Sequence, residues 1–150
     1  MLLFRISKNA YANKLTASGR QNRWNTEGKL VVYTASSLSL ACLETVVHGS
    51  PELLYNQDYK SVVIEIPLET SATIIDINNL PENWREREKQ SFTQNLGDKW
   101  SLKQETLLLK VSSVIISREF NYLINTKHPD FSKVFISEIN SFMFDKRIKS

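Results

Sequence analysis

An apolar helix is the feature that most restricts how this chain can fold. After an apolar strand-like run at residues 30–34, Ser36 or Ser37 can cap a helix that continues to about His48, before a glycine and a proline that stop it. Its apolar residues spread around nearly the whole circumference, which is typical of a buried helix. We therefore expect a strand followed directly by a helix that is covered on all sides.

One carboxylate, Glu44, interrupts that apolar helix. Burying an ionised carboxylate without partners costs on the order of several kcal/mol. Glu44 is therefore either at the helix edge, salt-bridged or solvated, or part of a functional site, and helix geometry leaves both open. Ser37, Glu44 and His48 share one stripe of the helix. The simplest role of His48 is to complement the helix dipole, and that of Cys42 is to fill the core.

Composition favours one globular domain over residues 1–150. Hydrophobic residues make up 41% and charged residues 23% of the chain. No apolar run approaches the length of a membrane span, the N-terminus lacks a signal-peptide pattern, and a single cysteine excludes an internal disulfide. These features favour a cytoplasmic protein. The net charge of +3 is not gathered in a basic patch, so we do not expect direct nucleic-acid binding.

Strand-like runs outnumber helical ones in the rest of the chain. We expect strands at residues 2–6, 30–34, 61–68, 73–79, 107–117, 120–125, 133–138 and 141–145. We expect helical segments at 9–15, 36–48, 82–90 and 91–100, loops at 16–29 and 50–58, and a bend or end at Gly97, with extended chain at 128–131. Short links between the strands imply mainly antiparallel pairing. The prediction is a compact α+β domain with helices packed on a mixed sheet.

Several polar residues outside the helix are candidates for a binding site. Arg23 lies in a long polar loop, and such loops are often functional. With Tyr33 and Glu44 it could form a site for an anionic, partly aromatic ligand. Arg5 is either a surface arginine or a phosphate contact at a strand end. Ser113 interrupts an apolar run, where it is either bonded to backbone or aimed inward by a bulge.

Blocks of sequence along nearly the whole chain resemble the RES domain family. They are RWNTEG and VVYTASSLSLACLETVVH, then QNLGDKW, then VSSVIIS and EFNYLINTKHPDF, in the family's order. The family is named for an arginine, a glutamate and a serine, and it contains toxins of bacterial toxin–antitoxin pairs. This chain departs from the family at Gln21 and Asn22, where glycines are usual, and at Ser112 and Thr126, where prolines are usual. These departures concern loop geometry.

The resemblance implies an enzyme that consumes NAD and has a fold similar to ADP-ribosyltransferase toxins. The family's arginine, glutamate and serine fall on Arg23, Glu44 and Ser113, which we expect to be catalytic. Tyr33 occupies another position that looks functional, and Arg5 belongs to the family's opening strand. By this resemblance Arg23, Tyr33 and Arg5 bind NAD. NAD would be a substrate, with no other cofactor and no metal, and the sequence contains neither a P-loop nor a GxGxxG motif.

The resemblance also implies a function and a partner. We expect a toxin that depletes NAD by cleaving its nicotinamide–ribose bond, through hydrolysis or phosphorolysis. One alternative is an ADP-ribosyltransferase that modifies a specific host protein, and a second is a non-catalytic or nucleic-acid-targeting toxin. The expected partner is a helix-turn-helix antitoxin that covers the active site, and contact with nucleic acid is expected only through that complex. No membrane partner is expected.

Overall fold

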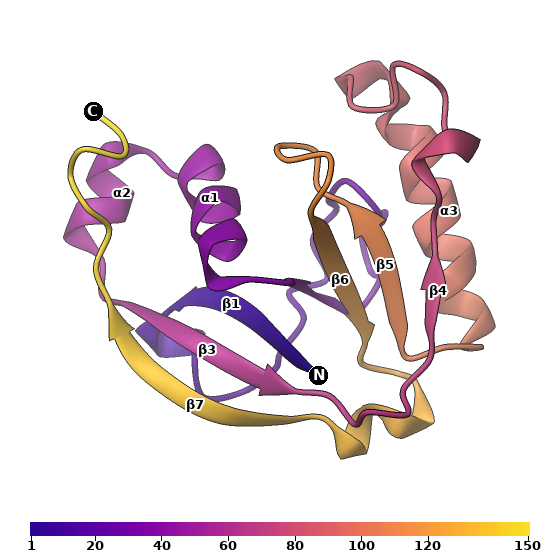
Figure 1. Ribbon diagram of the computed structural model, residues 1–150, viewed down its shortest axis with the longest axis horizontal. Helices are drawn as coiled ribbons and strands as arrows, with labels where there is room; N and C mark the ends of the chain where they lie inside the picture. Colours follow the sequence, from indigo (N-terminus) through magenta and orange to yellow (C-terminus); the bar gives the residue numbers. More distant parts are fainter.

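Seven strands form one sheet in the computed structural model, which describes residues 1–150 (Figure 1). The strands are β1 (Leu2–Lys8), β2 (Val31–Ala35), β3 (Tyr59–Glu65), β4 (Ala72–Ile74), β5 (Leu108–Ser112), β6 (Phe120–Asn125) and β7 (Phe135–Phe142). Their order is β4-β5-β6-β2-β1-β3-β7. All neighbouring strands run antiparallel except β4 and β5, which run parallel. The sheet confirms the predicted mixed, mainly antiparallel α+β fold.

The helices pack against this sheet in two groups. They are α1 (Leu38–His48), α2 (Pro51–Asn56) and α3 (Gln90–Lys103), with short 3₁₀ turns η1 (Asn9–Tyr11), η2 (Ile77–Asn79), η3 (Arg87–Lys89) and η4 (Pro129–Lys133). Figure 1 shows α1 and α2 on the side of β1 and β3, and α3 beside β4 and β5. None of the helices is both long and apolar enough to cross a membrane.

The helix α1 begins where the sequence predicts but is buried on one side only. The Ser37 hydroxyl accepts a hydrogen bond from the Leu40 N–H at 3.1 Å and so caps the first turn. Leu40, Ala41 and Val46 are buried against the sheet, whereas Val47 is 52% exposed. The prediction of a helix covered on all sides is wrong, because one face of α1 borders an open cleft.

Two other segments differ from the prediction in their local structure. The expected loop at 50–58 contains α2, which Ser50 caps and Pro51 begins, as both residues favour. The charged segment 82–90 forms turns and η3 instead of a regular helix. The carbonyls of Trp84 and Glu86 accept hydrogen bonds from the side chain of Arg23. Arg23 thus contacts this irregular segment from a distant loop.

The C-terminal part of the sheet also differs from the prediction. The two strands expected at 133–138 and 141–145 are one strand, β7, which pairs with β3 from end to end. A bulge at Val63/Ile64 lets the strand continue past an irregular register. His128 is extended as predicted, but the residues after it form η4, for which the His128 ring acts as a cap.

The helix α3 passes through Gly97 without a break, contrary to the predicted bend. A Cβ atom at Gly97 would overlap the Trp24 carbonyl oxygen and lie 2.8 Å from the carbonyl carbon. Glycine is therefore required because α3 crosses the backbone of the 22–25 loop at very short range. This crossing sets the position of the loop that carries Arg23.

We predict that Gly97→Ala destabilises the protein by about 2 kcal/mol, because the overlap costs more than the helix propensity that alanine adds. Urea unfolding followed by circular dichroism measures this free energy. The matched control is Asn95→Ala at an exposed position of the same helix, which should be neutral or slightly stabilising. If Gly97→Ala were as stable as the control, the close crossing of α3 and Trp24 would be wrong.

Candidate active site

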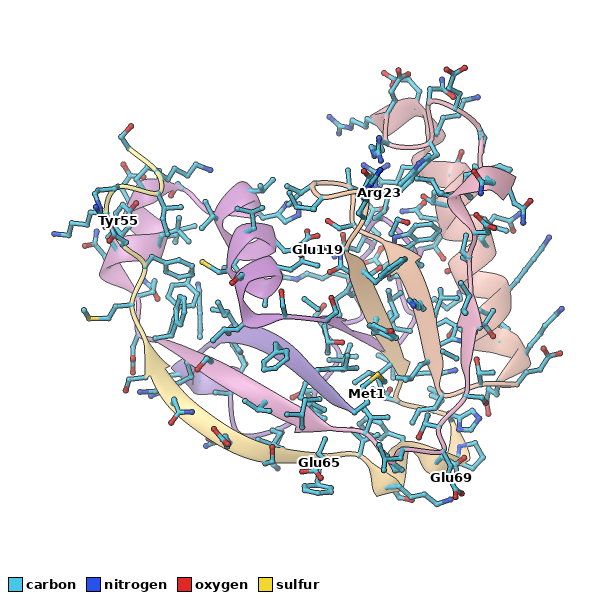
Figure 2. The ribbon with its side chains drawn as sticks, viewed as in Figure 1. Met1, Arg23, Tyr55, Glu65, Glu69 and Glu119 are labelled. Carbon is cyan, nitrogen blue, oxygen red and sulfur yellow. The ribbon has the colours of Figure 1, made fainter.

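A cleft of about 640 Å³ opens between α1 and the 22–24 loop. Four of the five site residues expected from the sequence line it: Arg5 from β1, Arg23 from the loop, Tyr33 from β2 and Glu44 from α1. Figure 2 shows Arg23 near the upper ends of β5 and β6, across from α1. Ser113 lies behind the cleft wall and is completely buried. The fold thus brings together residues that are far apart in sequence.

The carboxylate of Glu44 is held by hydrogen bonds and not by an ion pair. Its Oε1 atom accepts one bond from the Ser113 hydroxyl at 3.0 Å and another from the Asn121 amide at 2.7 Å. The three ion pairs of the chain are Lys60–Asp58, Lys133–Asp130 and Arg147–Asp145, and none of them lies in the cleft. Glu44 is therefore a half-buried carboxylate whose charge has no cationic partner in the protein.

The hydroxyl of Ser113 has a defined orientation. Its oxygen accepts hydrogen bonds from the backbone N–H groups of Ile115 and Ile116, both at 3.1 Å. Its lone pairs are thus occupied, so its proton is donated to Glu44. Ser113 follows the last residue of β5 directly, at the start of a turn and not in a bulge. In this position the hydroxyl orients the carboxylate and does not reach the surface of the cleft.

Arg23 and Arg5 contribute positive charge that the protein leaves unpaired. The Nη1 atom of Arg23 donates to the carbonyls of Trp84 and Glu86 at 3.4 and 3.3 Å, which are long bonds to neutral acceptors. The guanidinium of Arg5 makes neither a hydrogen bond nor an ion pair within the chain. Burial lowers the pKa of both arginines, yet arginine stays protonated at neutral pH. The cleft is therefore electrostatically suited to an anion.

Tyr33 forms part of the wall beside Arg23. Its hydroxyl donates to Asn25 Oδ1 at 2.5 Å and accepts from the Trp24 N–H at 3.2 Å. Burial raises the pKa of the Tyr33 phenol well above its usual value, so the hydroxyl stays protonated and neutral. Because the hydroxyl is used to hold the 24–25 backbone, the aromatic ring is the part of Tyr33 that a ligand could contact.

Sequence reasoning missed two asparagines of this region. Asn25 is 1% exposed and holds the loop through the carbonyls of Arg20 and Thr26 as well as through Tyr33. Asn121 reaches Glu44 from β6. The sequence of β6 places Asn121 in a strand, but gives no sign of its partner, which lies on a different element. His48 also lines the cleft, near its exposed edge, and no His, Cys, Asp or Glu cluster suited to a metal ion is present.

Comparison with known proteins relates the whole chain to one family. The family model described as the RES domain matches residues 2–145. A protein of Sphingobium sp. strain YBL2 named Prs ADP-ribosylating toxin is 38% identical over 91% of this chain and 88% of its own length. Toxin Res of Yersinia enterocolitica is 33% identical over 99% of this chain and 100% of its own length.

A solved structure has the same fold at much lower sequence similarity. It is a chain of the Mycobacterium tuberculosis MbcT–MbcA toxin–antitoxin complex, with a TM-score of 0.74 and 12% identity, covering 95% of this chain and 84% of that one. The match extends over nearly all of the sheet and its helices. The structural match shows the fold, whereas the family model and the relatives named as toxins show that the chain belongs to the RES domain family of toxins.

Proposed function

We propose that this protein is the toxin of a toxin–antitoxin pair and that it cleaves the nicotinamide–ribose bond of NAD in the cleft. The observation that carries the proposal is a carboxylate without an ion pair, fixed on one oxygen by two donors, in a cleft that also contains two unpaired arginines. NAD combines a pyrophosphate anion with a cationic nicotinamide, so it complements both charges. The cleft volume of about 640 Å³ falls in the ~300–1,000 Å³ range of ligand sites.

Each side chain has a role that follows from its chemistry. Arg23 and Arg5 bind pyrophosphate oxygens, because a guanidinium offers several donors in a planar fork. The ring of Tyr33 packs against the nicotinamide. Glu44 stabilises the positive charge that develops on the ribose as the glycosidic bond breaks, as carboxylates do in glycoside cleavage. Ser113 keeps the carboxylate in place.

The reaction balances with a simple acceptor. The bond between the ribose C1′ and the nicotinamide nitrogen breaks, and its electron pair leaves with nicotinamide, which becomes neutral. The acceptor oxygen forms the new bond to C1′. Water releases a proton to solvent in this step, whereas phosphate attacks through an unprotonated oxygen. Water as acceptor gives ADP-ribose, and inorganic phosphate gives a phosphorylated ADP-ribose. Both outcomes deplete NAD, and both use the same charge stabilisation by Glu44.

Transfer of ADP-ribose to a protein is the second candidate function. It is favoured by the 38% identity to a relative that is named an ADP-ribosylating toxin. The first step is identical, and only the acceptor differs. An open cleft mouth bordered by Val47 and Leu53, which are 52% and 45% exposed, would admit an acceptor side chain.

The proposed partner is a helix-turn-helix antitoxin that covers the cleft. The support is the likeness of the fold to a chain of a toxin–antitoxin complex. The exposed apolar side chains at the cleft mouth, Val47 and Leu53, suit such a contact, since interface centres are enriched in apolar residues. A bound antitoxin would keep NAD away from Glu44.

We predict that Glu44→Gln lowers the rate of nicotinamide release about a hundredfold, because it keeps the shape of the side chain and removes the charge. Release is measured by chromatography of NAD incubated with the purified protein, with and without phosphate. Glu52→Gln on the exposed surface of α2 is the matched control and should retain the native rate. Equal rates in Glu44→Gln and the native protein would contradict the proposal.

The acceptor is identified by a separate experiment. NAD labelled in its adenylate part is added to a cell extract with the native protein or with Glu44→Gln. Hydrolysis or phosphorolysis leaves the label in small molecules only, which is the expected result. A labelled protein band that needs the native protein would instead establish ADP-ribosylation of a protein.

A further inference from the structure

Asn121 makes the shorter of the two hydrogen bonds to Glu44. Its Nδ2 atom lies 2.7 Å from Oε1, compared with 3.0 Å for the Ser113 hydroxyl. A hydrogen bond is shorter and stronger when its donor or its acceptor is ionised. The amide must present its NH₂ group here, because an ionised carboxylate only accepts hydrogen bonds. Asn121 is therefore a hydrogen-bond donor to Oε1 of Glu44.

The fold holds Asn121 rigidly. It lies in β6, paired with Ala35 of β2 on one side and with Val111 of β5 on the other. Strands with partners on both sides have little freedom to shift. The amide therefore approaches Glu44 from the sheet, while the Ser113 hydroxyl approaches it from the turn after β5.

Both donors bind the same oxygen of Glu44. The Oε1 atom receives two hydrogen bonds, whereas Oε2 receives none from the protein. This asymmetry fixes the plane of the carboxylate and leaves one oxygen with free lone pairs in the cleft. An oxygen held in this way needs no rearrangement when positive charge develops in front of it, which is the basis of electrostatic preorganisation.

We propose that Asn121 is a positioning residue for Glu44, and that Asn121 and Ser113 together select Oε2 as the oxygen that faces the reacting ribose. The proposal rests on the proposed function and deepens it. Asn125, four residues later in the same strand, binds backbone groups only. Asn125 is 1% exposed and bonds to the Ser101 carbonyl and the Lys127 N–H. The side chain of Asn121, in contrast, lines the cleft and hydrogen-bonds only to Glu44.

The kinetic arm of the test compares Asn121→Ala with the native protein. The expected result is a kcat for nicotinamide release that falls about ten- to a hundredfold, with the KM for NAD changed no more than about twofold. The reason is that the amide acts through Glu44 and does not bind the rest of NAD. An unchanged kcat, or a loss seen only in KM, would overturn the proposal.

The second arm does not need NAD. In Asn121→Asp a new carboxyl group lies at hydrogen-bond distance from Glu44 Oε1, and two carboxylates so close share a proton. Carbon NMR of labelled glutamate side chains, assigned with Glu44→Gln, should therefore show Glu44 taking up its proton at a higher pH than in the native protein. The other titratable side chains that line the cleft are the same in both proteins: Arg5, Arg23, Tyr33, His48 and Tyr59.

A matched pair elsewhere in the chain provides the control. The Asn140 amide also donates to a glutamate, Glu138 Oε2, at 3.4 Å on the exposed strand β7. Asn140→Asp should leave both kcat and the Glu44 titration unchanged. If Asn121→Ala does not fold, as judged by circular dichroism, the near-isosteric Asn121→Asp supplies both measurements, since it too should lose kcat.

The two arms separate failure of this inference from failure of the proposed function. Absence of nicotinamide release by the native protein would refute NAD cleavage. The NMR titration of Glu44 would then be the measurement that tests the contact between Asn121 and Glu44. An unchanged Glu44 titration in Asn121→Asp would overturn the positioning role in either case. The positioning role is supported if Glu44 takes up its proton at a higher pH in Asn121→Asp and kcat is reduced in Asn121→Ala.

Discussion

The site depends on the two hydrogen bonds that hold the Glu44 carboxylate in a partly buried place. An apolar helix supplies the position, and the Ser113 hydroxyl and the Asn121 amide supply the hydrogen bonds. No cation neutralises it, although both arginines of the cleft, Arg5 and Arg23, are also left without an ion pair. A cleft that keeps unpaired charges of both signs is less stable alone than with a complementary ligand. Binding of such a ligand would therefore stabilise the folded protein as well.

The two walls of the cleft come from different elements of the fold. One wall is formed by α1, which comes directly after β2 and is capped by Ser37. The Arg23 wall depends on α3, which crosses the Trp24 backbone at Gly97, and on the carbonyls of Trp84 and Glu86. The distance between the carboxylate and the arginine is therefore set by tertiary packing. A change in α3 is expected to affect the site even though α3 carries none of its charges.

Local patterns were sufficient to predict part of this structure. The strand-like run at 120–125 located β6, and the serine before the apolar run located the start of α1. The single carboxylate among apolar residues made Glu44 a candidate, although the pattern left open whether it lies at the helix edge or in a functional site. These features were predictable because each depends on neighbours within one element.

The remaining features depend on contacts between elements far apart in sequence. The charged 82–90 segment has the composition of a helix, but its carbonyls bind Arg23, some sixty residues earlier. Gly97 looked like a bend because the Trp24 carbonyl that requires it is invisible in the α3 sequence. The Ser113 hydroxyl donates its proton to Glu44 because its oxygen already accepts hydrogen bonds from two N–H groups of the turn that follows it. Asn121 could be placed on a strand face, but not opposite Glu44.

The most direct test is a crystal structure of Glu44→Gln with NAD bound, since this variant should bind NAD and turn it over slowly. The account predicts that the pyrophosphate lies on Arg23 and Arg5, and that the ribose C1′ faces the side-chain atom of residue 44 that Ser113 and Asn121 leave free. NAD bound outside the cleft, or with its nicotinamide ribose away from residue 44, would contradict it.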